Sequence, residues 1–509
     1  CSCIDNRQAF NLSISVSFAF HTMEFDSVRS QVTTGKLFVT ACLGIIFFIN
    51  AFDAHGVEGV VPLIQINYDI KDAQTATIRT FSTIAQTITY GLIWILGDVF
   101  DRRKLFLVSL STWITLSLCS IVLGSTYFVV FVAFRSLAAS ASSAFTVLTP
   151  VILADLWRDR ALGVALMFMS ANELMTTQIT AILNSWIVTS GVPWQSGLIA
   201  GPLVAIVPLI GLLCASRTFR SPEYRRSLQR SFANAFSILK IKSFVLIAAE
   251  LTCGAFFARA FWFWFPTMLL NAWTDFPDAF FGFSYTTVTT FNSLAKIAGN
   301  VIGLPTILWI AQSWRHGTGL CSGREGFTRA YPIVVSAGAS VYAAAYFVGI
   351  LMVVENYIVF LGVMFFVGLG ASADMSLSAQ MKLMVVPTSS RPAAVALSRL
   401  ISGIVTTPAA QLAGLISDTV RGDSMLPSDR FRAYQLALLC TVSFLVLGVI
   451  CDMLLVVFFP EDCRKAEEID EQELKRVDES TYLIGTPKSR SESVFDTLIR
   501  SRTTTLNSY

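Results

Sequence analysis

The chain has 509 residues, of which 54% are hydrophobic and only 14% are charged. Soluble domains carry about 25% charged residues, so this composition indicates a protein whose surface is solvated mainly by lipid. The net charge of +3 and the lack of basic tracts interleaved with aromatic residues argue against a nucleic-acid partner.

Twelve apolar stretches follow one another between Lys36 and Pro460. A bilayer core about 30 Å thick needs roughly 20 apolar residues per helix, and runs of this length must be helices there. We therefore predict an all-α membrane protein with twelve transmembrane helices. In chain order the expected spans are 36–64, 75–97, 104–124, 127–154, 162–189, 197–215, 243–271, 279–311, 331–353, 356–386, 392–417 and 433–459.

A long basic segment divides the spans six and six, an arrangement typical of internally repeated carriers. We expect an N-terminal six-helix half over 36–215, a linker over 216–242 and a C-terminal six-helix half over 243–459. The linker reads either as a helix lying on the membrane surface or as a solvated connection. Residues 1–35 and 460–509 are expected to be disordered.

Lysine and arginine are concentrated in alternate loops. The positive-inside rule places these loops, and with them both chain termini, in the cytosol. The loop between spans two and three is a short charged hairpin with Asp98, Arg102 and Arg103. This hairpin is either a conformational switch that contacts the inner end of span eleven or a charged turn that fixes topology.

The hairpin resembles the signature loop of the major facilitator superfamily, with Asp98, Arg102 and Arg103 at its acidic and basic positions. Further segments resemble the first, fourth and eleventh spans of the Spinster branch, whose members transport lipids. These segments are 49–70, 134–160 and 385–418. The resemblance implies the major facilitator fold and a carrier that moves a lysophospholipid or sphingolipid by alternating access.

Two positions depart from the family pattern. Ala54 stands where Spinster proteins have an arginine after the first-span aspartate, and Ser142 stands where their fourth span has a glutamate. The family implicates both groups in proton coupling. Coupling to protons is therefore left open for this chain.

Charged residues inside the predicted spans are functional candidates, because each costs roughly 3 kcal/mol or more at mid-bilayer. Asp53 lies near Gly59 and Pro62, which permit a bend in span one. We expect Asp53 to be a proton-sensing and gating group, the alternative being a structural acid. Glu173 and Lys296, in spans five and eight, either pair and lock one state or each find a local partner.

Arg135 opens span four and can pair with Asp53, hold an anionic headgroup or extend to the interface. Ser142 is grouped with it as a substrate-binding candidate. The aromatic residues Phe257, Phe261 and Trp262 of span seven either line a cavity for an acyl chain or pack against lipid.

Glu479, Leu483 and Ile484 fit an acidic dileucine sorting signal, which adaptors for endosomes and lysosomes read. We therefore expect a lysosomal, endosomal or plasma-membrane protein. The sequence shows no metal-ligand spacing, no cofactor-binding loop and no nucleophile–base pair, so an enzyme is not expected. The alternatives are a carrier of small organic anions on the same fold and a sensor or scaffold without transport.

Overall fold

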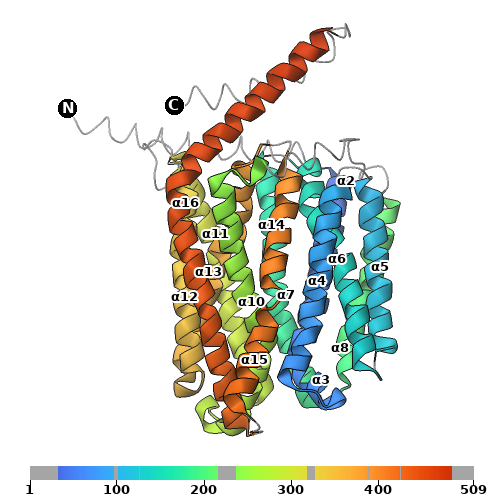
Figure 1. The fold of residues 1–509 in the computed structure, drawn as a ribbon, viewed down its shortest axis with the longest axis vertical. Coiled ribbons are helices and arrows are strands. Elements are labelled where there is room, and N and C mark those ends of the chain that lie inside the picture. The colour runs from blue at the N-terminus through green and yellow to red at the C-terminus, as the bar shows by residue number, and fades with distance from the viewer. Residues whose placement is uncertain are drawn as a thin grey trace, which may run out of the picture. The chain divides into compact units, whose positions relative to one another are not determined.

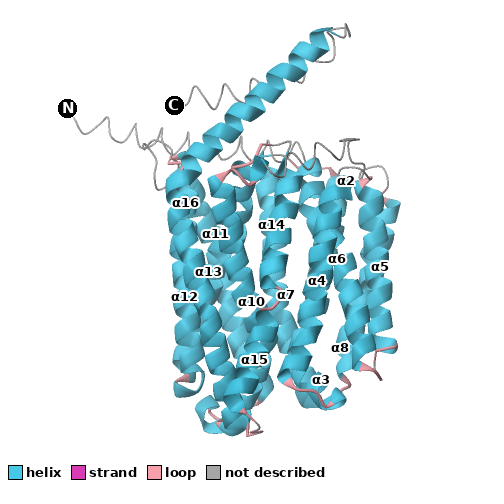
Figure 2. Ribbon diagram, viewed as in Figure 1, coloured by secondary structure: helices cyan, strands magenta, loops and turns pink. Residues whose placement is uncertain are grey.

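The computed structural model describes residues 33–483, apart from 97–100, 125, 158, 216–236, 318–326, 388–389, 423 and 425. Throughout the described residues the regular elements are helices and none is a strand (Figure 2). Ten of these helices are long and apolar enough to cross a membrane. The prediction of an all-α membrane protein is confirmed, and each predicted span coincides with one helix or with two consecutive ones.

The first six predicted spans correspond to seven helices (Figure 1). They are α2 (Thr34–Gly59), α3 (Val61–Tyr68), α4 (Asp72–Leu96), α5 (Arg102–Val122), α6 (Phe128–Leu156), α7 (Asp159–Ser190) and α8 (Trp194–Cys214). The later spans correspond to α10 (Lys242–Asp275), α11 (Tyr285–His316), α12 (Ala330–Glu355), α13 (Tyr357–Met384), α14 (Arg391–Thr406), α15 (Ala409–Arg421) and α16 (Pro427–Leu483), with a 3-10 turn η1 (Pro277–Phe280) before α11.

The chain divides into two compact units whose boundaries fall within or beside helices. Unit 1 comprises Cys1–Leu228, Trp262–Leu294 and Thr407–Tyr434. Unit 2 comprises Gln229–Phe261, Ala295–Thr406 and Gln435–Tyr509. In addition to the N-terminal helices, unit 1 thus contains the end of α10, η1, the start of α11, α15 and the start of α16. The six-and-six division stays a prediction.

Unit 1 is held by helix-on-helix packing. In it α2 packs on α7 and α8, α6 packs on α4 and α5, and α15 packs on α4. Its core includes Phe106, Trp113 and Phe145, which are all less than 2% exposed. The Phe145 ring lies 5.9 Å from Phe106 and 5.7 Å from Trp113, centroid to centroid, so aromatic packing joins α5 to α6.

The first span is broken at Val60, between α2 and α3. Pro62 occupies the first turn of α3, where the absence of a backbone N–H carries no penalty. A side chain on Gly59 would collide with Asn184 of α7, and Asn184 Nδ2 donates to the His55 carbonyl at 3.2 Å. The bend predicted near Gly59 and Pro62 is confirmed.

The eleventh span is also divided, which the sequence analysis did not predict. α14 ends at Thr406 and α15 begins at Ala409, with Pro408 as its N-cap residue. Proline has no backbone N–H to donate to the preceding turn, so a continuous helix loses a hydrogen bond there. The unit boundary falls at this break, so that α14 belongs to unit 2 and α15 to unit 1.

The predicted disordered tail begins too early. α16 continues as a helix from the last predicted span to Leu483. Pairs spaced four residues apart support the helix beyond Pro460: Lys465 Nζ lies 2.6 Å from Glu461 Oε1, and Arg464 Nε lies 3.7 Å from Glu468 Oε1. Residues 1–32 and 484–509 lie outside the described residues.

In unit 2, α11 and α13 approach each other at glycines. A side chain on Gly299 would collide with the Phe365 carbonyl, and one on Gly368 would collide with the Lys296 carbonyl. Small residues at such crossings allow backbone contact between membrane helices.

We expect Gly299→Ala to lower stability by about 1–3 kcal/mol, because the added methyl overpacks the helix crossing. Thermal unfolding of the purified protein in detergent measures the change. Gly362→Ala is the matched control, since a Cβ at Gly362 has nothing within 4 Å and alanine favours a helix. Equal thermal unfolding midpoints for the two variants would contradict the close contact between α11 and α13.

Candidate functional site

Asp53 of α2 and Arg135 of α6 form a buried ion pair, here named the central pair. Arg135 Nη1 lies 2.9 Å from Asp53 Oδ1, and Arg135 Nη2 donates to the Asp53 carbonyl at 3.0 Å. Asp53 is 4% exposed and Arg135 is 6% exposed. The two ends of one guanidinium thus hold both the side chain and the backbone of a single residue.

Two further helices surround the central pair. Ser117 of α5 donates to Asp53 Oδ2 at 3.5 Å. Gly201 of α8 lies so close that a Cβ there would be 3.7 Å from the Asp53 Cβ. The carboxylate therefore faces the protein interior among α2, α5, α6 and α8, and not the lipid.

In the central pair, each buried charge compensates the other. Burying two charges is unfavourable unless they compensate each other, and removing one partner leaves the other uncompensated. While Asp53 is ionised, Arg135 is committed to it and is not available to an anionic headgroup. The pairing that was one alternative for Arg135 is thus the arrangement in this structure.

A second group of ion pairs lies one turn further along α2. His55 Nδ1 is 2.6 Å from Glu58 Oε2, and Arg79 Nη1 of α4 is 3.2 Å from Glu58 Oε1. The Trp262 ring of α10 lies 6.3 Å from the His55 ring, edge to face. Residues three positions apart lie on the same face of a helix, so the spacing of His55 and Glu58 is the sequence signal for their contact. Neither residue is among the predicted site residues.

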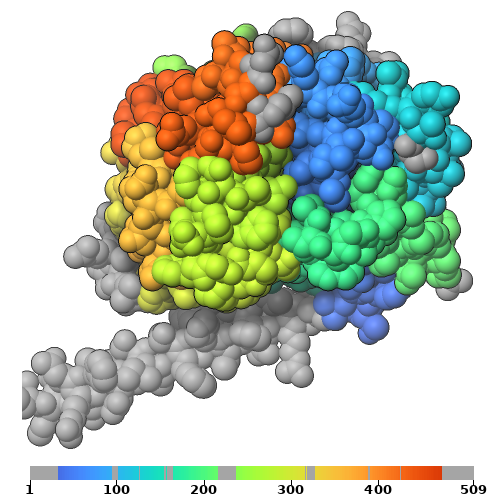
Figure 3. All heavy atoms as spheres, turned by 90° about the horizontal axis from the view of Figure 1, so that it is seen from below, coloured from blue at the N-terminus to red at the C-terminus, as the bar shows by residue number. Residues whose placement is uncertain are grey.

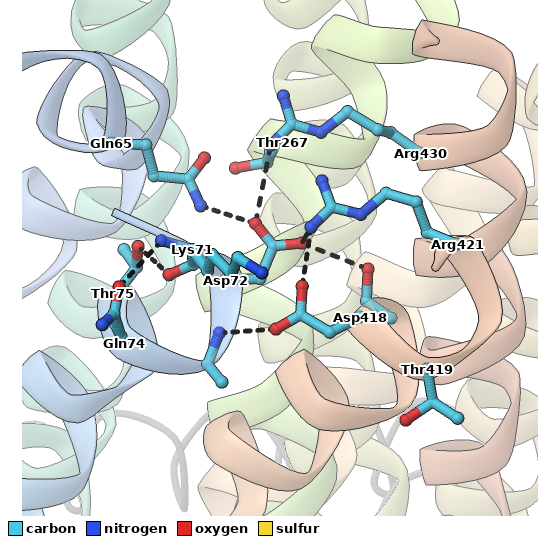
Figure 4. Close-up of polar contacts among 12 residues, drawn as sticks. Gln65, Lys71, Asp72, Gln74, Thr75, Thr267, Asp418, Thr419, Arg421 and Arg430 are labelled. Atoms are coloured by element: carbon cyan, nitrogen blue, oxygen red, sulfur yellow. Dashed lines mark hydrogen bonds and ion pairs between the residues drawn. The ribbon is translucent and has the colours of Figure 1, made fainter. Parts of the chain in front are cut away.

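Asp72, the first residue of α4, is fully buried at 0% exposure and is the centre of a third group (Figure 4). Gln65 of α3 donates to its Oδ1 at 2.7 Å. Arg421 Nη2 lies 3.5 Å from Oδ2 and Arg430 Nη2 lies 3.5 Å from Oδ1. We name Gln65, Asp72, Ser417, Asp418, Arg421 and Arg430 the Asp72 cluster.

Asp418 adds a contact between helix ends. Its Oδ2 accepts a hydrogen bond from the Ala73 N–H at 3.1 Å, and its Oδ1 accepts one from Arg421 at 2.7 Å. The first turn of a helix has unpaired N–H groups and a partial positive charge. A carboxylate from the last turns of α15 thus stabilises the start of α4.

Gly414 permits this approach of α15 to α4. A Cβ at Gly414 would lie 3.0 Å from the Trp264 ring and 3.4 Å from the Asp72 backbone. Trp264 Nε1 also donates to the Ala410 carbonyl at 2.8 Å. Figure 3, a view from below, shows the α3–α4 region in blue beside α15 in orange. The Asp72 cluster therefore connects α4 to α15 at this end of unit 1.

The aromatic candidates separate into two environments. Phe257 and Phe261 are 0% exposed and pack on Tyr346 of α12 at 4.7 and 4.6 Å between centroids. They are packed in this conformation and do not line an open cavity. Trp262, the next residue, is half-buried and belongs to unit 1.

The other intramembrane candidates stay as predictions. Lys296 of α11 is buried in unit 2, with its Nζ 5.5 Å from the Phe261 ring centroid. Glu173 of α7 is half-buried in unit 1, and its proposed pairing with Lys296 is untested. Ser142 donates to the Ala139 carbonyl of its own helix at 2.9 Å. Because its hydroxyl is neutral, it supplies no charge at this position.

The hairpin and the sorting signal lie partly outside the residues that the structure describes. Asp98 lies outside the described residues, as does the side chain of Arg102 at the start of α5. The Arg103 backbone N–H donates to Asp101, the N-cap of α5, at 3.0 Å. Glu479 and Leu483 lie in the last turns of α16, and Ile484 falls outside the described residues.

Comparison with known proteins adds family evidence. A family model described as Major Facilitator Superfamily matches residues 43–320. Protein spinster homolog 1 of Xenopus tropicalis is 24% identical over 479 residues, covering 90% of this chain and 87% of that protein. Sphingosine-1-phosphate transporter SPNS2 of Danio rerio is 24% identical over 501 residues, covering 91% of this chain and 94% of that protein.

Solved structures share the fold. A crystal structure of a bacterial homolog to human lysosomal transporter Spinster, in an inward-facing and occupied conformation, gives a TM-score of 0.60 at 13% identity over 85% of this chain and 99% of that one. The nucleoside transporter NupG gives 0.56 at 13% identity over 82% of this chain and 99% of that one.

We expect Asp53→Asn to destabilise the protein by about 3–5 kcal/mol, because it leaves the buried Arg135 charge uncompensated. Thermal unfolding in detergent measures this effect. The double variant Asp53→Asn/Arg135→Gln should recover much of the loss, since neither charge is then left alone. A single variant as stable as Asp278→Asn, which changes an exposed carboxylate of η1, would argue against a tight central pair.

We expect Asp72→Asn to increase amide hydrogen exchange in α15 and in the first turn of α4 by about 10- to 100-fold, equivalent to losing charge-assisted hydrogen bonds of roughly 1.5–3 kcal/mol. Exchange measured by mass spectrometry reports these peptides separately from the core of unit 1. Unchanged exchange in α15 would mean that the Asp72 cluster does not hold it against α4.

Proposed function

Since the chain belongs to the Major Facilitator Superfamily, we propose that it is a secondary transporter that moves an amphipathic lipid, a lysophospholipid or a sphingolipid, across a membrane by alternating access. Transport, not catalysis, is the activity that this membership supports. The similarity to Spinster proteins and to a sphingosine-1-phosphate transporter extends over about nine-tenths of the chain, which favours a lipid.

The central pair is the observation that carries the mechanism. A lipid with an anionic headgroup needs a cationic partner inside the bundle, and Arg135 is a guanidinium already buried there. Arginine binds phosphate through two parallel hydrogen bonds, and Arg135 now directs one such donor at the Asp53 carboxylate and the other at the Asp53 backbone carbonyl. The headgroup and Asp53 therefore compete for the same guanidinium.

Protonation of Asp53 would decide this competition. A neutral carboxyl attracts Arg135 much less than a carboxylate does, so uptake of a proton releases the guanidinium for the headgroup. Departure of the proton restores the central pair and expels the anion. Proton coupling then needs only Asp53, and Ser142 at the family's glutamate position does not prevent it.

The Asp72 cluster supplies a gate in this scheme. Alternating access requires contacts that form in one state and break in the other. The cluster joins the start of α4 to α15 and the start of α16 through several charge-assisted bonds. We assign it the role of closing this end of unit 1, with the predicted switch of Asp98, Arg102 and Arg103 beyond the other end of α4.

The relatives also bear on the membrane in which the protein is located. The bacterial protein whose structure gives a TM-score of 0.60 is a homolog to human lysosomal transporter Spinster. A lysosomal or endosomal membrane, or the plasma membrane, is the proposed location. Adaptors would read the tail signal of Glu479, Leu483 and Ile484.

A carrier of small organic anions is the second candidate. Phe257 and Phe261, the proposed acyl-chain wall, are fully packed in this conformation, and a nucleoside transporter shares the fold. The Arg135 guanidinium serves a small anion as well as a lipid headgroup. A sensor without transport is the third reading, favoured by the serine at position 142.

Uptake into proteoliposomes tests the proposal. We expect labelled lysophosphatidylcholine or sphingosine-1-phosphate to accumulate at a rate that small organic anions do not match. Asp53→Asn should reduce that rate by more than about tenfold, a loss of more than about 1.4 kcal/mol of barrier lowering, whereas Asp278→Asn should not. Uptake of small anions alone would favour the second candidate, and no uptake of either class would favour the third.

A further inference from the structure

A separate group of buried acids lies wholly within unit 2. Glu250 is on α10, Asp374 on α13 and Asp452 on α16. Glu250 is 4% exposed and Asp452 is 0% exposed, while Asp374 is half-buried. None of these residues contributes to the central pair or to the Asp72 cluster, so the mechanism above leaves three intramembrane carboxyls unexplained.

The three helices bring these carboxyls together. The Glu250 and Asp374 side chains share a hydrogen bond, and both interact electrostatically with Asp452. The helices are close at two glycines. A Cβ at Gly254 of α10 would lie 3.9 Å from Asp374 Oδ2, and a Cβ at Gly448 of α16 would lie 3.8 Å from the Glu250 carbonyl oxygen.

Buried oxygens in this group lack hydrogen-bond partners. Among the described residues, neither carboxylate oxygen of Asp452 has a partner, and Glu250 Oε2 has none. An ionised carboxyl can only accept hydrogen bonds, so two carboxyls can hydrogen-bond to each other only if one of them carries a proton. An unpartnered carboxylate in such a place is strongly unfavourable.

The neighbouring groups do not neutralise this charge. Lys382 of α13 attracts Glu250 and Asp374, but its Nζ donates to Ser398 of α14 at 3.0 Å. Ser378 donates to Asp374 Oδ1 at 3.0 Å. The remaining polar or titratable neighbours are Tyr342 of α12, Cys253 of α10, Arg399 of α14 and Cys451 of α16. Among the described residues of unit 2, Lys382 is thus the buried cation that faces Glu250 and Asp374, and Arg399 beside it is exposed.

We propose that Glu250, Asp374 and Asp452 form a proton-binding site in unit 2, in which Glu250 and Asp374 share one proton and Asp452 binds a second. A metal ion is a poorer ligand, since no group of three His, Cys, Asp or Glu within the described residues has the geometry to hold one. Asp374 is the half-buried member of the group, and protons would enter past it.

The site would make the packing of unit 2 depend on protons. With both protons bound, one carboxylate charge remains opposite Lys382, and α10, α13 and α16 pack without repulsion. Loss of the protons places like charges on three adjoining helices, which drives them apart. This site does not depend on lipid transport, because it requires only that the carboxyls bind protons.

Infrared spectroscopy of the full-length protein in lipid nanodiscs tests the proposal without a substrate. A protonated carboxyl gives a C=O stretching band that an ionised one lacks, and the band shifts in D₂O. We expect this band in the wild type at neutral pH and its loss as pH is raised. Asp452→Asn and Glu250→Gln should each remove a different component of it, whereas Asp278→Asn should leave it intact.

Several outcomes would overturn the proposal. One is a wild type without a protonated-carboxyl band from mildly acidic to mildly alkaline pH. Another is a band that disappears only in Asp53→Asn, which would assign the proton to the central pair. If one of the two variants does not fold, the other, compared with Asp53→Asn, assigns the band. A failed lipid-uptake assay leaves the spectrum unaffected, so the two proposals fail independently.

Discussion

The contact between Asp53 and Arg135 is the constraint on which the rest of unit 1 depends. A charge inside a bundle is tolerated only with a partner, and this partner lies on another helix. The guanidinium also holds the Asp53 backbone, so α2 and α6 are tied at one point. The break in the first span lies within unit 1, and the division of the eleventh span lies at its boundary. After the first break Gln65 contacts Asp72, and after the second Asp418 contacts the Ala73 N–H, both at the start of α4.

The sequence predicted well those features that depend on local composition. Apolar runs located the helices, and Gly59 with Pro62 located the break after α2. The charged residues of the tail were misread, because a polar segment reads as disorder although pairs such as Glu461–Lys465 support a helix. Local patterns thus predicted where helices exist better than where they end.

The site was predicted only in part, for a physical reason. Asp53 and Arg135 stand out because each is a lone charge within an apolar run. Asp72 and Arg421 look like ordinary loop charges, and no local pattern relates Asp72 to Ser417, 345 positions away. Their burial arises from tertiary packing, which allows Gly414 to approach the Asp72 backbone. For Phe257 and Phe261 the reverse holds. Their aromatic side chains suggest the wall of a cavity, but in the structure both rings pack against Tyr346.

The division of the eleventh span at Pro408 has a mechanical consequence. The boundary between the units falls between α14 and α15 here, whereas it falls inside the continuous helices α10, α11 and α16. Proline has no amide hydrogen to lose, so swivelling at Thr407–Pro408 costs less than bending a continuous helix would. The angle between α14 and α15 can therefore change at these two residues, while the backbone hydrogen bonds within each helix stay intact.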